Sequence, residues 1–149
     1  MRIEVRRATS TDSERATEVA QAAKAHWGYP AEWLEAWRDD LTFTPDLIEK
    51  HPTFVASVDG HVVGVCQIQQ AERGAVLDHV WVDPACHGKG VGRALVEHAL
   101  STAYGTIAVV ADENAERFYI KLGAQRVGDV SAPMPGAEHR KLPLLEWVR

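Results

Sequence analysis

The chain has 149 residues, of which 46% are apolar and 25% charged, and its formal net charge is −5. These values are typical of one soluble globular domain, here expected over residues 1–149, whose core needs neither a disulfide framework nor a structural metal. The acidic balance disfavours a nucleic-acid partner, and no segment approaches the roughly 20 apolar residues of a membrane span. We therefore expect a cytoplasmic monomer or homodimer without a nucleic-acid or membrane partner.

The first third of the chain predicts one strand followed by helices. Residues 2–8 alternate between apolar and charged side chains, as a half-buried strand does. Thr11 and Glu14 have the spacing of a capping box, which predicts a helix that runs to about residue 25 and is broken at Gly28. Further helical turns are expected at 31–41 and 44–51.

The remainder of the chain is richer in strands. Asp59-Gly60 separates two β-rich runs and is a strong hairpin signal, and Gly123 has the position of a helix C-cap. This order of elements predicts an α/β (α+β) fold with a mixed sheet and helices on both faces. The expected strands are 53–58, 61–69, 75–82, 106–111, 124–130 and 142–148, and the expected helices are 91–104 and 113–122.

A glycine-rich loop between an expected strand and an expected helix is the most informative segment. Residues 80–95 read VWVDPACHGKGVGRAL. The alternating glycines allow a phosphate to approach the backbone amides at the helix N-terminus, while Lys89 and Arg93 add positive charge. Neither a Walker loop nor a dinucleotide GxGxxG pattern fits these residues. The loop therefore predicts a phosphate or pyrophosphate cradle, and the alternative is a tight turn that merely needs glycine.

Two motifs in this order resemble the GNAT superfamily of acetyl-CoA-dependent N-acetyltransferases. Gly90 and Gly92 match its acetyl-CoA-binding signature, in which Arg or Gln is followed by two residues, Gly, one residue, and Gly or Ala. His87 stands at the position of the usual Arg or Gln. The segment NAERFYIKLGA, residues 114–124, is similar to the family's segment from an Asn through Phe-Tyr to Gly-Phe, with Ala124 in place of the last Phe.

The resemblance implies a GNAT-like mixed, mostly antiparallel central sheet of about seven strands, with helices on both faces and two neighbouring strands that splay apart. It also implies an acyltransferase that moves the acetyl group of acetyl-CoA directly to the amine of a small molecule, without a metal. The alternatives are protein or peptide N-acetylation and a non-catalytic CoA-binding module. The residues expected to bind the cosubstrate are Val80, Trp81, Val82, His87, Gly88, Lys89, Gly90, Val91, Gly92, Arg93, Asn114 and Phe118. Asn114 has a second interpretation as a helix cap.

Three residues are expected to be catalytic. Tyr119 matches the family's general-acid tyrosine, which would protonate the leaving thiolate, although its place on an apolar helical stripe also predicts packing. Asp78 and His79 are candidate bases for the acceptor amine. Alternation along a regular strand brings only one of them into the cleft, and a β-bulge would change that parity.

The break after the first helix is expected to contribute to acceptor binding. The candidates there are His26, Trp27 and Tyr29. Together with Trp33 and Trp37, these aromatic side chains either bind an apolar or cationic acceptor or dock the first two helices on the sheet.

Overall fold

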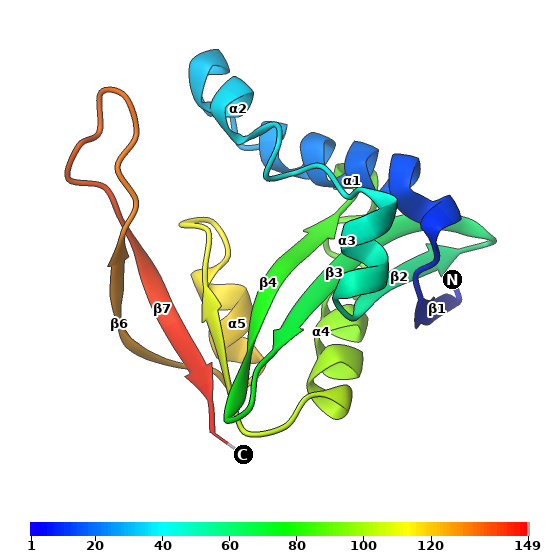
Figure 1. The fold of residues 1–149 in the computed structure, drawn as a ribbon. Coiled ribbons are helices and arrows are strands. Elements are labelled where there is room, and N and C mark those ends of the chain that lie inside the picture. Colours follow the sequence, from blue (N-terminus) through cyan, green and yellow to red (C-terminus); the bar gives the residue numbers. More distant parts are fainter. Residues whose placement is uncertain (149) are drawn as a thin grey trace.

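Seven strands form one mixed sheet in the computed structural model, which describes residues 1–148 (Figure 1). Their bounds are β1 (Ile3–Arg7), β2 (Thr53–Val58), β3 (His61–Gln70), β4 (Gly74–Val82), β5 (Thr106–Val110), β6 (Gln125–Ser131) and β7 (Lys141–Trp147). The spatial order is β1-β2-β3-β4-β5-β7-β6, and only β4 and β5 run parallel. The expected mixed, mostly antiparallel sheet is therefore confirmed. Arg149, the last residue of the expected domain, lies outside the described residues.

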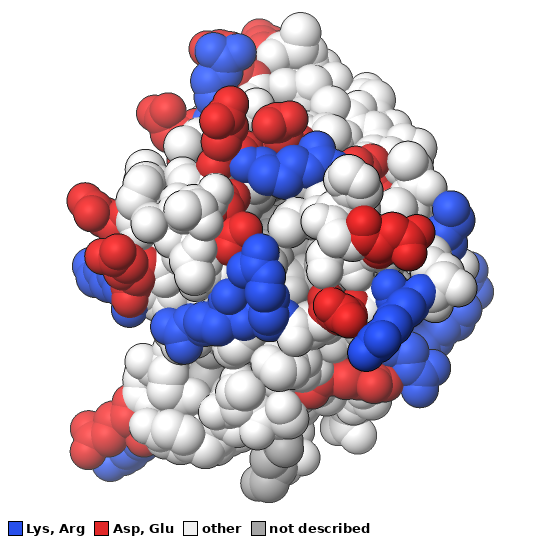
Figure 2. Space-filling view, turned by 90° about the vertical axis from the view of Figure 1, so that its right-hand side faces the viewer, with Lys and Arg blue, Asp and Glu red and all other residues white. Residues whose placement is uncertain are grey.

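Helices cover both faces of this sheet. They are α1 (Ser13–Ala25), α2 (Ala31–Trp37), α3 (Pro45–Lys50), α4 (Val91–Thr102) and α5 (Glu116–Lys121). One cluster of buried apolar side chains joins α1 and α3 to the sheet, and a larger one joins α4 and α5 to its other face. Figure 1 shows α1 and α4 on opposite sides of the sheet. Among the described residues, no helix is long and apolar enough to cross a membrane. Acidic and basic side chains are interspersed on the face shown in Figure 2.

The start of α1 differs from the prediction. A short 3-10 turn precedes the helix, and the capping box is formed by Thr9 and Asp12, with the Thr9 backbone N–H donating to Asp12 Oδ2 at 2.9 Å. Hydrogen bonds from Arg6 hold the pKa of Asp12 below its ordinary value. The predicted Thr11–Glu14 box is therefore wrong, because the charged Asp12 captures the first free amide earlier in the chain.

Two helices are shorter than predicted. The second ends at Trp37 instead of residue 41, and α5 begins at Glu116 instead of residue 113. Residues 112–114 instead form a turn in which Asp112 Oδ1 accepts a hydrogen bond from the Asn114 backbone N–H at 3.1 Å. The polar side chains in this turn satisfy backbone groups locally and so delay the helix.

Close packing at Gly64 brings α4 against β3. A Cβ atom on Gly64 would lie 2.8 Å from Leu95 Cδ1 and 3.0 Å from Val91 Cγ1, and both side chains are buried. Val91 is the first residue of α4, directly after the glycine-rich loop. The position of that loop therefore depends on the absence of a side chain at Gly64.

We predict that Gly64→Val lowers the free energy of unfolding by about 1–3 kcal/mol, because the added methyl groups overpack the interface with α4. Gly128→Val is the matched control, since a Cβ at Gly128 on β6 meets nothing within 4 Å. Urea unfolding of both variants measures the difference. Equal destabilisation by the two substitutions would contradict the close packing at Gly64.

Candidate active site

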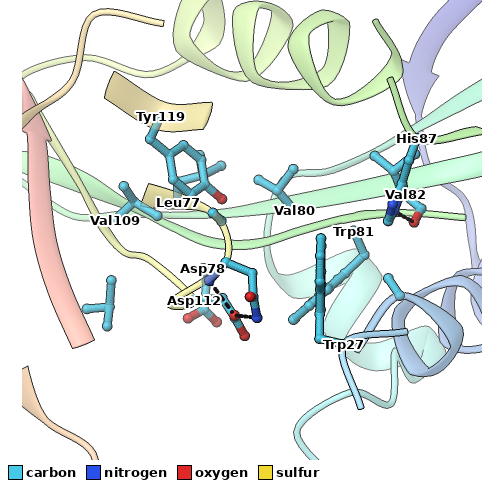
Figure 3. Close-up of a pocket in the computed structure, with 14 residues that line it drawn as sticks. Trp27, Leu77, Asp78, Val80, Trp81, Val82, His87, Val109, Asp112 and Tyr119 are labelled. Carbon is cyan, nitrogen blue, oxygen red and sulfur yellow. Dashed lines mark hydrogen bonds between the residues drawn. The ribbon is translucent and has the colours of Figure 1, made fainter. Parts of the chain in front are cut away.

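A cleft opens where β4 and β5 separate. The two strands pair over only three positions, from Gly74–Thr106 to Val76–Ala108, after which β5 pairs only with β7 on its other side. The space between them has a volume of about 150 Å³. We call this space the reaction cleft; its walls include Leu77, Asp78, Val80, Val109 and Tyr119 (Figure 3).

A β-bulge in β4 brings Asp78 into this cleft. His79 pairs with Gln67 and Leu77 with Ile68, so Asp78 has no partner of its own on β3. Its carboxylate lines the cleft, is 40% exposed, and accepts a hydrogen bond from Gln69 Nε2 at 3.0 Å. The bulge thus changes the parity of the strand at the candidate bases, and an oxygen of Asp78 lies 3.5 Å from His79 Nε2.

His79 turns away from the cleft. Its ring packs at 4.9 Å from that of Phe43, and its Nδ1 accepts a hydrogen bond from Trp81 Nε1 at 3.0 Å. Burial lowers the pKa of His79. A neutral ring with its Nδ1 accepting carries its proton on Nε2, the atom that lies near Asp78.

Tyr119 supplies a buried hydroxyl from the opposite wall. Its ring packs against Phe118 and Trp147, while the hydroxyl points into the reaction cleft (Figure 3). Burial raises the pKa of Tyr119, and the neighbouring Cys66 and Asp112 raise it further. The phenol therefore keeps its proton. The predicted packing of Tyr119 is confirmed, and its hydroxyl is available to the cleft, while the general-acid role stays a prediction.

The glycine-rich loop forms a second pocket beside the reaction cleft. Gly88 and Gly90 have φ values of +75° and +86°, in the region that side chains other than glycine rarely adopt, and Gly90 caps α4. Within residues 1–148, the amides of Gly88, Lys89 and Gly90 donate no backbone hydrogen bond. This loop pocket has a volume of about 420 Å³, and its walls include Val82, Gly88, Gly90, Val91, Gly92, Arg93, Asn114 and Phe118.

The loop pocket has the properties that an anion requires. The free amides of the loop join the first amides of α4, which have no partner within the helix, and the helix dipole adds to their positive field. A Cβ on Gly92 would lie 3.1 Å from Phe118 Cζ, so the glycine also permits the close approach of α5. Lys89 is exposed, and Arg93 forms an exposed ion pair with Glu97 at 2.7 Å.

Asn114 does not cap α5, because Ala115 is the capping residue. The cap interpretation is therefore wrong. Its side-chain amide donates to Asp112 Oδ1 at 3.1 Å and to the Tyr29 hydroxyl at 3.0 Å, and the residue borders both the reaction cleft and the loop pocket. Its predicted contact with the cosubstrate is compatible with this place.

A buried ion pair spans the opening between the two halves of the sheet. Lys24 of α1 donates to Asp112, which follows β5, and both side chains are at least 86% buried. The Tyr29 hydroxyl donates to the same carboxylate at 2.8 Å. Burial opposes ionisation of Asp112, yet the bonds and charge of Lys24, with those of Asn114 and Tyr29, hold its pKa below its ordinary value.

The aromatic cluster around α2 encloses cations of the chain itself. Lys24 Nζ lies 4.0 Å from the ring centroid of Trp37 and 5.0 Å from that of Tyr29. Arg140 Cζ lies 5.4 Å from the centroid of Trp33, whose Nε1 donates to the Pro135 carbonyl at 2.9 Å. The cluster therefore packs α2 against α1 and against the loop between β6 and β7, whereas the packing interpretation expected these rings to dock the helices on the sheet.

Trp27 and His26 lie apart from this cluster, beside the glycine-rich loop. Trp27 stacks on His87 of the glycine-rich loop, and His26 contacts both rings edge-on. Trp27 lines both the reaction cleft and the loop pocket. The described residues that line these two spaces do not include His26, Tyr29, His79 or Lys89. The structure thus brings most of the predicted site together around two adjoining spaces, whose common walls include Val82, His87 and Asn114.

Lys24 and Asp112 are not among the site residues that the sequence predicts. Lys24 has the ordinary appearance of a basic residue in the last turn of a helix, and nothing in the local pattern marks it as buried. Asp112 carried a weak signal, because an acidic residue directly follows a short apolar strand next to the second motif.

The sequence is similar to those of known acetyltransferases. The family model described as an acetyltransferase (GNAT) domain matches residues 49–123. The peptidyl-lysine N-acetyltransferase YjaB of Salmonella typhimurium is 32% identical over 109 residues, covering 67% of this chain and 72% of that protein.

Solved structures share the whole fold. A GCN5-related N-acetyltransferase from Rhodopseudomonas palustris has a TM-score of 0.84 at 20% identity and covers 100% of this chain and 97% of its own. The PaiA N-acetyltransferase from Thermoplasma acidophilum, solved with coenzyme A, has a TM-score of 0.79 at 19% identity and covers 100% of both chains.

We predict that Asp112→Asn lowers the free energy of unfolding by about 3 kcal/mol, because Lys24 is left buried without a counter-charge. The double variant Lys24→Met/Asp112→Asn should recover most of this loss, while Arg2→Gln, which breaks an exposed pair with Glu4, should change it by less than about 1 kcal/mol. Urea unfolding measures all three. Since the pKa of Asp112 is lowered, its contribution is present above about pH 4 and is lost as the pH falls below that value.

A loss in Lys24→Met/Asp112→Asn equal to that in Asp112→Asn would show that the carboxylate acts through its hydrogen bonds alone. That result would contradict the role assigned to the ion pair.

Proposed function

The chain belongs to the GNAT acetyltransferase family and is an acyltransferase, and from this premise we propose that it transfers the acetyl group of acetyl-CoA directly to a primary amine. One observation carries the proposal. The glycine-rich loop, the bulged Asp78 and the buried Tyr119 hydroxyl border two adjoining spaces that share walls. An anion-binding loop thus stands next to a proton donor and a proton acceptor.

The loop residues fit the phosphates of a CoA thioester. Gly88 and Gly90 leave the backbone bare on the side of the loop pocket, and the free amides there suit oxyanions. Lys89, an exposed residue of the same loop, is proposed to add positive charge. When bound, acetyl-CoA supplies an acetyl group that is activated as a thioester.

Tyr119 is proposed to protonate the departing thiolate. Its raised pKa keeps the hydroxyl protonated, so that a hydrogen-bond and proton donor is present where the thiolate forms. Backbone amides of β4 between Val80 and Val82 are the proposed donors to the thioester oxygen, since this part of the strand lines the cleft and has no partner on β5.

Asp78 is the proposed base for the acceptor ammonium. Its carboxylate lines the reaction cleft, whereas His79 is half-buried, packs against Phe43 outside the cleft and has a lowered pKa. His79 acts through Asp78 in this proposal, because its Nε2 lies 3.5 Å from the carboxylate. Asp78 accepts the proton that the amine must lose before it attacks.

The acceptor is proposed to be a primary amine. A small-molecule amine is the acceptor expected from the sequence, and the similarity to a peptidyl-lysine N-acetyltransferase favours the lysine side chain of a peptide as a second candidate. The internal cations Lys24 and Arg140 already occupy the aromatic cluster, so the acceptor ammonium is expected at Asp78.

The cytoplasm is the proposed location. Cys66 and Cys86 are free thiols, which supports a reducing environment.

We predict that Gly90→Glu abolishes the binding of acetyl-CoA, because a side chain at a φ of +86° strains the loop and places negative charge against the phosphates. Gly60→Glu is the matched control: Gly60 has a φ of +83° and lies in the β2–β3 turn. Calorimetric titration with acetyl-CoA measures both. The proposed function fails if the unchanged protein does not bind acetyl-CoA at millimolar concentration.

We predict that Tyr119→Phe lowers turnover by about 10²-fold or more while the affinity for CoA changes little, because only the proton donor is removed. Release of free CoA is followed with small primary amines and with an N-terminally blocked peptide that contains one lysine. The same peptide with norleucine in place of lysine controls for hydrolysis. Unchanged turnover would leave Tyr119 with a packing role only.

A further inference from the structure

Trp27 stands at the junction of the two spaces that form the proposed active site. It follows α1 and precedes Gly28, and its side chain remains 47% exposed. It borders both the reaction cleft and the loop pocket. Any molecule that extends from the glycine-rich loop to Tyr119 therefore passes this ring.

Contacts among three rings hold Trp27 at this junction. The indole lies 6.0 Å from the imidazole of His87 with an angle of only 20° between their planes. His26 packs edge-on against both rings, at 4.9 Å from Trp27 and 5.1 Å from His87. These contacts join the end of α1 to the glycine-rich loop.

His87 is itself fixed to the end of β4. Its Nε2 lies 2.9 Å from the carbonyl oxygen of Val82, a hydrogen bond that sets the plane of the imidazole (Figure 3). The flat face on which Trp27 lies is thus fixed by the backbone at the edge of the cleft. A tryptophan that is half exposed yet positioned in this way is a preorganised apolar surface.

The chemistry of an acyl-CoA matches this surface. Between its phosphates and its thioester runs a slender arm of methylene and methyl groups with two amides. An indole face makes favourable contact with such apolar groups and excludes water from them. The glycine-rich loop receives the phosphates in the proposed function, so the arm crosses the junction where Trp27 lies.

We propose that Trp27, positioned by His87, packs against the arm of the acyl-CoA and is a cosubstrate-binding residue rather than an acceptor-binding one. The inference rests on the proposed function, and it explains why His87 stands where the family usually has Arg or Gln. The imidazole of His87 gives Trp27 a flat ring to stack on. A Gln side chain has no ring, and an Arg side chain would bring a positive charge.

The test compares CoA with adenosine 3′,5′-bisphosphate, a nucleotide that carries phosphates but no arm. Trp27→Ala should weaken CoA binding about tenfold in calorimetric titration and leave the affinity for the bisphosphate unchanged. Retained bisphosphate binding also shows that the variant is folded. Tyr104→Ala, which removes an aromatic ring that is 58% exposed and lines neither space, should bind both ligands like the unchanged protein.

A double-mutant cycle tests the positioning role of His87. His87→Gln keeps a donor for the Val82 carbonyl but removes the flat ring, and it should weaken CoA binding by a smaller factor than Trp27→Ala. Combined with Trp27→Ala it should add little, because both changes remove the same stacked surface. Additive losses would overturn the positioning role.

Other outcomes separate the inference from the proposed function. Equal loss of CoA and bisphosphate binding in Trp27→Ala would show that the ring supports the loop instead of the arm, and no loss of either would show that it contacts neither. Both results overturn the inference alone. Failure of the unchanged protein to bind CoA would overturn the proposed function and the inference together.

Discussion

The site depends on the short pairing between β4 and β5. Three paired positions hold the strands together, and beyond Val76 the backbone of β4 no longer pairs with β5. An open gap in a sheet exposes backbone donors and acceptors, which is costly unless another group satisfies them. In the proposed function, the unpaired backbone groups of β4 in this gap form hydrogen bonds with the extended cosubstrate.

The Lys24–Asp112 ion pair compensates for this gap from the side of α1. It links the helix on one half of the sheet to the turn that follows β5 in the other half. Tyr29 and Asn114 bond to the same carboxylate, so the turn is tied to the segment before α2 as well. Beyond the three paired positions, polar contacts of Asp112 therefore link the two halves of the sheet where no strand ladder does.

Local patterns predicted most of the fold but not the contacts that complete the site. Alternation, the Asp59-Gly60 turn and the glycines from Gly88 to Gly92 are signals within a few residues of one another, and the strands and the loop followed from them. The bulge at Asp78 arises from pairing with β3, and the burial of Lys24 arises from partners about 90 residues away. Such long-range contacts leave almost no trace in the neighbouring sequence. The same holds for Trp27, whose partner His87 lies in a different motif.

The ion pair also bears on the electrostatics of the proposed transfer. Negative charge develops on the thioester oxygen and then on sulfur, and an isolated buried carboxylate beside Tyr119 would oppose both. Asp112 borders the same cleft as Tyr119 and raises the pKa of Tyr119. At longer range, the ammonium of Lys24 offsets the negative field of the Asp112 carboxylate, because the two groups form an ion pair. Asp78, by contrast, forms no ion pair with a Lys or Arg among residues 1–148, which suits its proposed role of attracting an ammonium and accepting its proton. The proposed roles of the two carboxylates thus differ because, in the part of the chain that the structure describes, Asp112 is paired with a buried Lys and Asp78 is not.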